Sequence, residues 1–410
     1  MKLTIASVLF SVALASCSSA KHPKWGQSME MNPYSGDVSG AAYFMTNEPT
    51  GNYIIASDIG SDGQLNPRRA VYTGGLGGHS NNGGGGDGLL SQGSVAVSSA
   101  SNMLAVVNAG SSTISLFSFD SSKPSDLKLI GAPISSGGQF PTSVAFSKDG
   151  SMLCALNGGE VNGVSCFKVS ATAVAPLTQT QRSLGLNQTT PSTGPPGSAS
   201  QIFVAPDGKN VIVSVKGMSA SEPGYLAVWD VTNGTLSETF TSVPTPSGGQ
   251  LPFGFVPIQG QQAFVVSDPA LGYTIVDLSG QNRSAAYPIN GQKAVCWAAY
   301  SSKTGNYYLV DAGANLITEV AVDGNLKAST VNSYSTGNNT GPLDPSVATI
   351  GNKDYLYALA AGAQEVNVMR LDGAGQAQTI QKLDITGPAR VVGIPVNGTN
   401  LQGMATFFKA

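Results

Sequence analysis

Hydrophobic and polar positions alternate along this chain in short runs, and clusters of Gly, Pro, Asn, Asp and Ser separate one run from the next. The stretch from residue 93 to residue 134 shows the pattern, with the runs GSVAVS, MLAVVN, TISLFSFD and LKLIGAPI divided by the polar segments SASN, AGSS and SSKPSD. A period of two with β-branched and aromatic residues in the runs is typical of half-buried strands. The pattern predicts four antiparallel strands joined by tight turns.

The phrase formed by the second strand, a turn and the third strand recurs along the chain. Aligned copies begin near Met45, Val107, Leu156, Val213, Val266, Val310 and Leu359. The copies are spaced about 44 to 62 residues apart, and repeats of this length that contain strands but no helical pattern are typical of β-propellers. We therefore expect an all-β, seven-bladed β-propeller with four strands per blade, in a single domain over residues 39–410.

The two ends of the repeat array predict how the ring closes. The first strands, AAYFMTN and NYIIASDI, match the second and third strands of a blade, so the first blade lacks an innermost strand. The segment ARVVGIPVN, residues 389–397, has the pattern of that missing strand. We expect it to join the first blade and so to remove the open sheet edges.

Charge and length of apolar runs exclude some partners. The chain carries 21 Lys and Arg against 24 Asp and Glu, a net charge of −3, with no basic block. A nucleic-acid partner therefore has no electrostatic footprint in the sequence. After the N-terminus no stretch approaches the roughly 20 apolar residues that a membrane span needs, so no transmembrane segment is expected.

The N-terminus predicts export. Residues 1–20 combine one early Lys, an apolar run and small residues, which is the pattern of a secretory signal cleaved near Ala20. The sequence from Leu14 to Cys17 also reads as a lipoprotein box, so a lipid anchor on Cys17 is the alternative to secretion. Residues 21–38 are expected to form an N-terminal tail.

Two further features fit an exported protein. Cys154 and Cys166 lie symmetrically about NGGEVNG, so a hairpin there would place them opposite each other, as a disulfide or as two packed thiols. Five Asn-x-Ser/Thr sequons stand in turn-like surroundings, a number that chance alone would produce, and they permit glycosylation. The sequons begin at Asn187, Asn233, Asn282, Asn338 and Asn397.

Three segments carry a resemblance to a known family: DGLLSQGSVAVSSASNMLAVVNAGSSTISLFSF, GQKAVCWAAY and SGAAYFMTN. They resemble the secreted seven-bladed propeller lactonases, a family that includes 6-phosphogluconolactonase-like proteins and fungal 3-carboxymuconate cyclases. The resemblance implies a reaction that opens or closes a lactone ring without metal or other cofactor, using Arg, His and Glu at the mouth of the channel. The chain departs from the family's Arg-His segment, because Pro141, Thr142 and Ser143 occupy those positions in GGQFPTSVAF.

The connections that open on one face of a propeller locate the expected site. The residues that precede the predicted inner strands should ring the channel mouth, and they offer a single cation, Arg390, which suits a carboxylate or a polarised lactone carbonyl. The ring comprises Ser94, Ser143, Gln201, Phe253, Cys296, Ser346 and Arg390.

Three residues are candidates for catalysis. Under the predicted closure Glu48 and Arg390 belong to one blade, either as an acid/base beside an anion-binding group or as a structural ion pair. His79 lies in the glycine-rich loop GGLGGHSNNGGGGDGLL, where it is either a general acid/base or an exposed bystander. Five further residues are candidates for substrate binding; the alternative is channel packing for Trp297 and loop hydrogen bonding for Gln92 and Gln201. They are Gln92, Gln201, Lys216, Trp297 and Asp311.

Two functions follow from the sequence. In the first, a monomeric exported enzyme forms or hydrolyses a lactone of a small carboxylate-bearing molecule, with Arg390 and Lys216 holding the carboxylate while His79 or Glu48 moves a proton. In the second, the propeller is a non-catalytic extracellular or cell-surface binding protein, because one fold hosts many functions.

Overall fold

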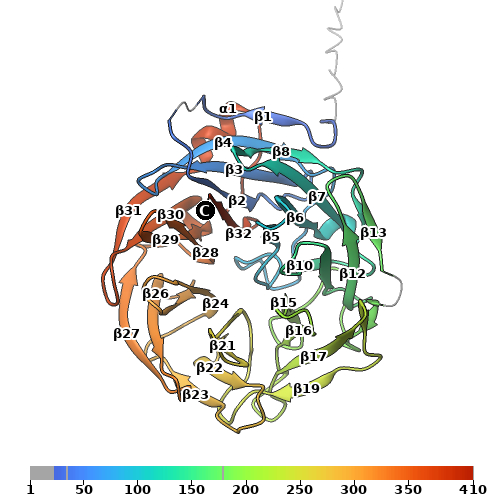
Figure 1. The fold of residues 1–410 in the computed structure, drawn as a ribbon, viewed down its shortest axis with the longest axis vertical. Coiled ribbons are helices and arrows are strands. Elements are labelled where there is room, and N and C mark those ends of the chain that lie inside the picture. The colour runs from blue at the N-terminus through green and yellow to red at the C-terminus, as the bar shows by residue number, and fades with distance from the viewer. Residues whose placement is uncertain (1–22, 34–35, 178–179, 410) are drawn as a thin grey trace, which may run out of the picture.

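The computed structural model describes residues 23–33, 36–177 and 180–409, and within them seven antiparallel sheets stand around a central axis. Figure 1 views this ring from one face, with successive sheets following one another in chain order. The prediction of an all-β, seven-bladed propeller is confirmed. The predicted signal sequence with Cys17 lies outside the described residues.

Blades 2 to 7 each run outward from the axis through four positions. The inner strands are β5 (Val95–Ser98), β10 (Pro141–Phe146), β15 (Ala199–Val204), β20 (Phe255–Pro257), β24 (Val295–Tyr300) and β28 (Pro342–Ile350). The second strands are β6 (Met103–Asn108), β11 (Met152–Asn157), β16 (Asn210–Val215), β21 (Ala263–Asp268), β25 (Tyr307–Asp311) and β29 (Lys353–Ala360).

The third strands are β7 (Thr113–Asp120), β12 (Gly163–Val169), β17 (Tyr225–Thr232), β22 (Gly272–Asp277), β26 (Leu316–Val322) and β30 (Glu365–Leu371). The outer strand of blades 2, 3 and 4 is divided into two pieces: β8 (Lys123–Leu129) with β9 (Ile134–Ser135), β13 (Val174–Pro176) with β14 (Arg182–Ser183), and β18 (Thr235–Leu236) with β19 (Thr241–Pro244). In blades 5, 6 and 7 it is β23 (Ala285–Pro288), β27 (Ala328–Ser335) and β31 (Ala377–Asp384).

Blade 1 unites the two ends of the described chain. From the axis outward it contains β32 (Gln402–Phe408), β2 (Gly40–Met45), β3 (Tyr53–Ile59), β4 (Leu65–Tyr72) and β1 (Ser28–Glu30). The C-terminal part of the chain therefore supplies the innermost strand, as predicted. The expectation of a tail over residues 21–38 is wrong for Ser28–Glu30, which forms a strand on the outer edge.

The closing strand is not the segment predicted. Residues 386–391 form the short helix α1 (Thr386–Val391) because the Asp384 carboxylate accepts the backbone N–H groups of Thr386 and Gly387, and Gly393, at φ 71°, ends the turn. Closure uses β32, in which Met404 packs on one face of the strand while Ala405 and Phe407 pack on the other.

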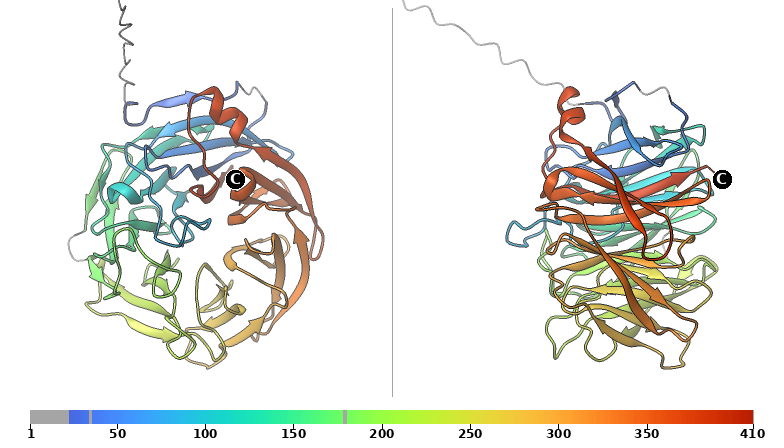
Figure 2. Two further views of the ribbon diagram at one scale, coloured as in Figure 1. Left: turned by 180° about the vertical axis from the view of Figure 1, so that it is seen from behind. Right: turned by 90° about the vertical axis from the view of Figure 1, so that its left-hand side faces the viewer.

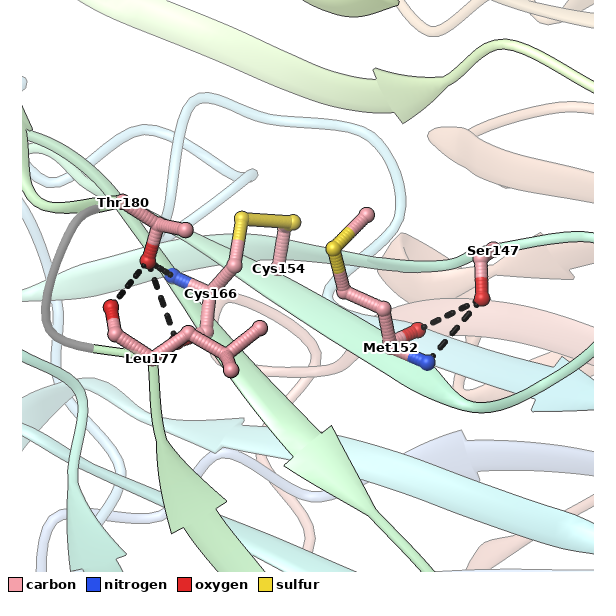
Figure 3. Close-up of a disulfide and its surroundings, with 6 residues drawn as sticks. All are labelled: Ser147, Met152, Cys154, Cys166, Leu177 and Thr180. Carbon is pink, nitrogen blue, oxygen red and sulfur yellow. Dashed lines mark hydrogen bonds between the residues drawn. A yellow bond between two sulfur atoms is a disulfide. The ribbon is translucent and has the colours of Figure 1, made fainter. Parts of the chain in front are cut away.

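A disulfide joins Cys154 on β11 to Cys166 on β12, with the two Cα atoms 4.0 Å apart (Figure 3). The alternative of two packed thiols therefore does not hold. Thr180 secures the far side of this hairpin, because its hydroxyl oxygen accepts the Cys166 N–H and the hydroxyl donates to the Leu177 carbonyl.

A loop between β4 and β5 enters the middle of the ring, as Figure 1 shows, and part of it projects from one face in the side view of Figure 2. We call residues 87–93 of this loop the plug segment. Gln92, near the end of this segment, makes two hydrogen bonds to one residue of blade 6. Its side-chain amide donates to the Ala298 carbonyl and accepts the Ala298 N–H, both at 2.9 Å. The amide thus pairs with the inner edge of blade 6 as a neighbouring strand would.

The plug segment also bonds to three other blades. The Ser91 hydroxyl donates to the Thr142 carbonyl of blade 3, and the Gln92 N–H donates to the Ser200 carbonyl of blade 4. The Gly93 N–H donates to the Asp344 carboxylate of blade 7 at 3.3 Å. The inner edges of several blades are therefore satisfied by one short segment across the axis.

Removing the Gln92 amide should destabilise the whole ring. In Gln92→Ala the buried N–H and carbonyl of Ala298 lose their partners, so the free energy of unfolding should fall by about 2 to 4 kcal/mol. Urea denaturation followed by circular dichroism measures the change. Gln376→Ala, an exposed glutamine on the rim, is the matched control and should change it by less than about 0.5 kcal/mol. Equal stability of the two variants would contradict this role of Gln92.

Candidate functional site

A cavity of about 590 Å³ opens at the end of the central channel. We call it the mouth cavity. It lies on the face formed by the connections between successive blades and by the turns between second and third strands, which is the face that the sequence predicts. Its walls come from the plug segment, the loops of blades 4 to 7 and the segment before the closing strand. The lining includes Gly86, Asp87, Leu90, Pro195, Phe253, Ala294, Cys296, Trp297, Ala312, Gly313, Gly341, Leu343, Ala361, Gly362, Gln364, Asn397, Gly398 and Thr399.

The plug segment forms the floor of the mouth cavity in a strained conformation. Asp87 and Leu90 adopt φ values of 62° and 55°, in the left-handed region that non-glycine residues rarely occupy. Such a conformation costs of order 1 to 3 kcal/mol and persists only where the surroundings hold it. Here a hydrogen bond from the Lys216 ammonium to the Leu90 carbonyl, 3.0 Å long, holds the floor in place.

Lys216 is almost completely buried beneath this floor. Its Nζ donates to the Ser198 hydroxyl at 3.0 Å as well as to Leu90, and it lies 4.5 Å from the centre of the Phe253 ring. Burial lowers the pKa of Lys216 to about 7, although the nearby Asp87 carboxylate opposes the shift. Lys216 is not among the residues that line the cavity, so its contacts assign it to supporting the floor.

Asp87 is one of the residues that line the mouth cavity, and it is almost completely buried. Burial raises its pKa to about 6, while the positive charge of Lys216 and the Ser91 N–H, which lies 3.4 Å from Oδ1, act in the opposite direction. Asp87 is therefore mostly ionised at neutral pH but close to titration. A carboxylate poised in this way can accept a proton and return it.

A second buried carboxyl group, Asp344, ties the plug segment to the closing strand. Its two oxygens accept the N–H groups of Gly93 and Gly403, at 3.3 and 2.9 Å. Burial, and then the charge of Asp87, raise the pKa of Asp344 to about 7. The Cys296 thiol completes the group, and its pKa is raised by burial, so this lining residue stays uncharged.

The three residues expected to catalyse do not bond to one another. Arg390 is exposed on α1, at the outer edge of blade 1 and away from the axis (Figure 1), so its expected place in the channel ring is wrong. Glu48 is buried and accepts a hydrogen bond from Asn400 at 3.2 Å, and burial raises its pKa. The His79 ring nitrogens lie 2.9 and 3.1 Å from the carbonyls of Ser80 and Gly85, within its own loop.

The remaining binding candidates bond chiefly to the backbone. The Gln201 amide pairs with the N–H and carbonyl of Phe255 on the next blade. The Asp311 carboxylate accepts the N–H groups of Lys293, Ala294 and Ala314 and so shapes the loop at the cavity wall. Trp297 lines the cavity, and its indole N–H donates to the Ser91 carbonyl at 2.9 Å.

Sequence reasoning missed Asp87 and Asp344. Asp87 stands in GGGGDGLLSQG, inside a segment that the sequence marks only as a flexible loop. An ionisable residue followed by the apolar pair Leu89 and Leu90 is a signal that such a loop turns inward. Asp344 precedes Pro345 in a predicted turn and carries no comparable signal.

Surface features bear on export and on other ligands. The five sequon asparagines are exposed, and Asn397 lies at the rim of the mouth cavity. Within residues 23–409, apart from the four undescribed positions, no group of three or more His, Cys, Asp or Glu side chains is arranged to hold a metal ion. In the same part of the chain no helix has the length and apolar character needed to cross a bilayer.

The buried carboxyls predict how stability depends on pH. Asp87 and Asp344 titrate near 6 and 7 in the folded protein but near 3.8 when unfolded, so between pH 5 and 7 the folded state holds protons that the unfolded chain has released. The free energy of unfolding should therefore fall by about 3 kcal/mol as the pH rises from 5 to 7. Above pH 7 the lowered pKa of Lys216 acts in the opposite direction.

Urea titrations at pH 5 and pH 7 measure this change. In Asp344→Asn the fall should be about one third of that of the unmodified protein, because only Asp87, whose pKa is raised less, still titrates in this interval. Stability that stays constant or rises across this interval would show that these carboxyls titrate normally in the folded protein.

Comparison with solved structures places the chain among seven-bladed propellers. A Pseudomonas aeruginosa periplasmic gluconolactonase superposes with a TM-score of 0.63 at 17% identity, over 84% of this chain and 96% of that chain. A Bacteroides fragilis protein provisionally assigned as a 6-phosphogluconolactonase gives 0.62 at 14% identity, over 92% and 100%. A Desulfotomaculum acetoxidans protein of unknown function gives 0.58 at 13% identity, over 90% and 99%.

The sequence itself matches no family model and no curated protein. Identities this low show a shared fold and leave the reaction to be argued from the site. The chain is thus similar in architecture to 6-phosphogluconolactonase-like seven-bladed propellers.

Proposed function

We propose that this protein hydrolyses a lactone in the mouth cavity, with Asp87 as the general base. The observation that carries the proposal is a single carboxylate on the floor of a largely apolar cavity, with a pKa raised to about 6. The shared fold with a gluconolactonase supports the same reaction class. Ring closure, the reverse reaction, would use the same group as an acid.

Hydrolysis needs only proton transfers at this site. The Asp87 carboxylate would take a proton from water as the water oxygen attacks the lactone carbonyl carbon. The tetrahedral intermediate then collapses, the ring C–O bond breaks, and the proton passes from Asp87 to the leaving alkoxide oxygen. The product is a hydroxy acid, and its carboxyl proton is released to solvent.

Lys216 acts on this reaction through Asp87 and the floor. Its charge favours the ionised carboxylate, while its bond to Leu90 holds the turn that contains Asp87. Lys216 is therefore a positioning residue, and the acid/base role expected of His79 or Glu48 moves to Asp87.

Non-catalytic binding is the second candidate function. It is favoured by the closed channel and by the absence of Arg, Lys and His from the lining of the mouth cavity, among the residues that the structure describes. A scaffold of this kind would hold a small molecule between Phe253 and Leu343 and release it unchanged.

Export is part of the proposal. A secretory signal over residues 1–20, or a lipid anchor on Cys17, would deliver the chain to an oxidising compartment. The disulfide between Cys154 and Cys166 supports this location, and the five exposed sequons are compatible with it.

Activity should depend on Asp87 and not on Arg390. A pH-indicator assay with uncharged lactones such as dihydrocoumarin should show turnover that rises with pH to a half-maximum near 6, the pKa of Asp87. Asp87→Asn should lower kcat by about 100-fold or more, since general base catalysis contributes about that much.

Arg390→Ala is the matched control, because Arg390 is exposed on α1 and should leave turnover unchanged. Turnover that survives Asp87→Asn but is lost in Arg390→Ala would move the site to α1. No turnover on any lactone by a protein that still binds them would support the binding function instead.

A further inference from the structure

We propose that the mouth cavity takes uncharged lactones that carry an apolar or aromatic substituent and rejects lactones that carry a phosphate or carboxylate. This inference rests on the proposed function in one respect, that the ligand is a lactone. The preference for uncharged ligands does not depend on turnover. It also departs from the carboxylate-bearing substrate that Arg390 suggests in the sequence.

Charge is the first argument. Among the lining residues the one group that is charged at neutral pH is Asp87, because burial keeps the Cys296 thiol protonated. An anion entering the cavity would lose its hydration and meet a carboxylate in an apolar setting, where like charges repel strongly. Asp344, hydrogen-bonded just behind the plug segment, adds to this repulsion whenever it is ionised.

The two cations that the sequence assigns to carboxylate binding do not compensate for this repulsion. Lys216 lies beneath the floor, and its ammonium already bonds to the Leu90 carbonyl and the Ser198 hydroxyl. Arg390 is not among the residues that line the mouth cavity; it lines a neighbouring hollow, which shares Gln364 with that cavity. An anionic substituent in the mouth cavity therefore has no free cationic partner among the residues that line it.

Apolar surface is the second argument. Leu90, Phe253, Trp297 and Leu343 are among the residues that line the cavity. The Phe253 and Trp297 rings pack edge to face with their centres 5.3 Å apart. Rings and alkyl groups gain from burial against such walls. The polar lining at the rim, including Gln364 and Thr399, is uncharged and can meet the hydroxyl groups of a ligand.

Volume is the third argument. Cavities of roughly 300 to 1,000 Å³ hold drug-sized molecules, and at about 590 Å³ this one leaves room around a bare six-membered lactone ring. A substituent of several carbon atoms would fill the space against Leu343 and Ala361. The favoured ligand is therefore larger and less polar than an unsubstituted sugar lactone.

Lactams test this preference without interference from hydrolysis. 3,4-Dihydro-2-quinolinone is the stable, uncharged analogue of dihydrocoumarin, and its 4-carboxylate is the matched anion. Calorimetric titration of the unmodified protein at pH 7.5 should give a Kd at least tenfold lower for the uncharged lactam. Gluconolactam, which is uncharged but polar, should also bind more weakly than the quinolinone.

Removing the charge of Asp87 should reduce the ratio of the two Kd values, carboxylate over uncharged lactam, severalfold. Asp87→Asn does this by substitution, and titration of the unmodified protein at pH 5 does it by protonation, so the test survives if the variant does not fold. Lys128→Met changes an exposed position of the outer strand β8 and is the control. It should leave the ratio of the two Kd values unchanged.

Equal or tighter binding of the carboxylate, or no binding of either quinolinone, would overturn the inference. Tight binding of the uncharged lactam by a protein that hydrolyses no lactone would sustain the inference while refuting the proposed reaction. The two proposals can therefore fail separately.

Discussion

The hydrogen bonds that the plug segment makes across the propeller axis are the interactions on which the rest of the structure depends. A ring of seven blades leaves the inner edges of its innermost strands facing an open channel, and their backbone groups need partners. Gln92 supplies the partner for Ala298, while Ser91 and Gly93 reach blades 3 and 7. Gly254 allows the close approach, because a Cβ there would lie 2.0 Å from the Gln92 Oε1.

The plug segment closes the channel, so that a cavity remains whose floor contains the ionisable residue Asp87. The chain turns back at Asp87 and Leu90 in left-handed conformations, and that turn places Asp87 in the lining of the cavity. Lys216 holds the turn from below and is itself perturbed by burial. Stability is thus lowered by buried charge and backbone strain at the place where chemistry is proposed, a common feature of functional sites.

Much of the fold follows from the sequence because the repeated pattern reports strands and turns directly. The seven blades, the hairpin that joins Cys154 to Cys166, and closure by the C-terminal part of the chain are all predicted correctly. The identity of the closing strand is not, because ARVVGIPVN has a strand-like composition and only the capping by Asp384 and the turn at Gly393 reveal a helix. Local capping chemistry therefore overrode a plausible periodic pattern.

The site was harder to predict than the fold because it depends on one misassigned strand and on contacts between segments that are distant in the sequence. The cavity lies on the expected face, and Phe253 and Cys296 of the predicted ring line it. Arg390 was placed in that ring only because its segment was predicted to be a strand, whereas it forms α1. Asp87 lies in a glycine-rich loop whose path across the axis depends on contacts with blades that are distant in the sequence. Residue spacing carries no information on such contacts.

The most direct test of this account is a crystal structure of the protein soaked with 3,4-dihydro-2-quinolinone. The account predicts the ligand in the mouth cavity, with its ring against Phe253 and Leu343 and its lactam N–H donating to the Asp87 carboxylate. A ligand bound instead beside Arg390 on α1, with the mouth cavity empty, would contradict the claim that the plug segment builds the functional site.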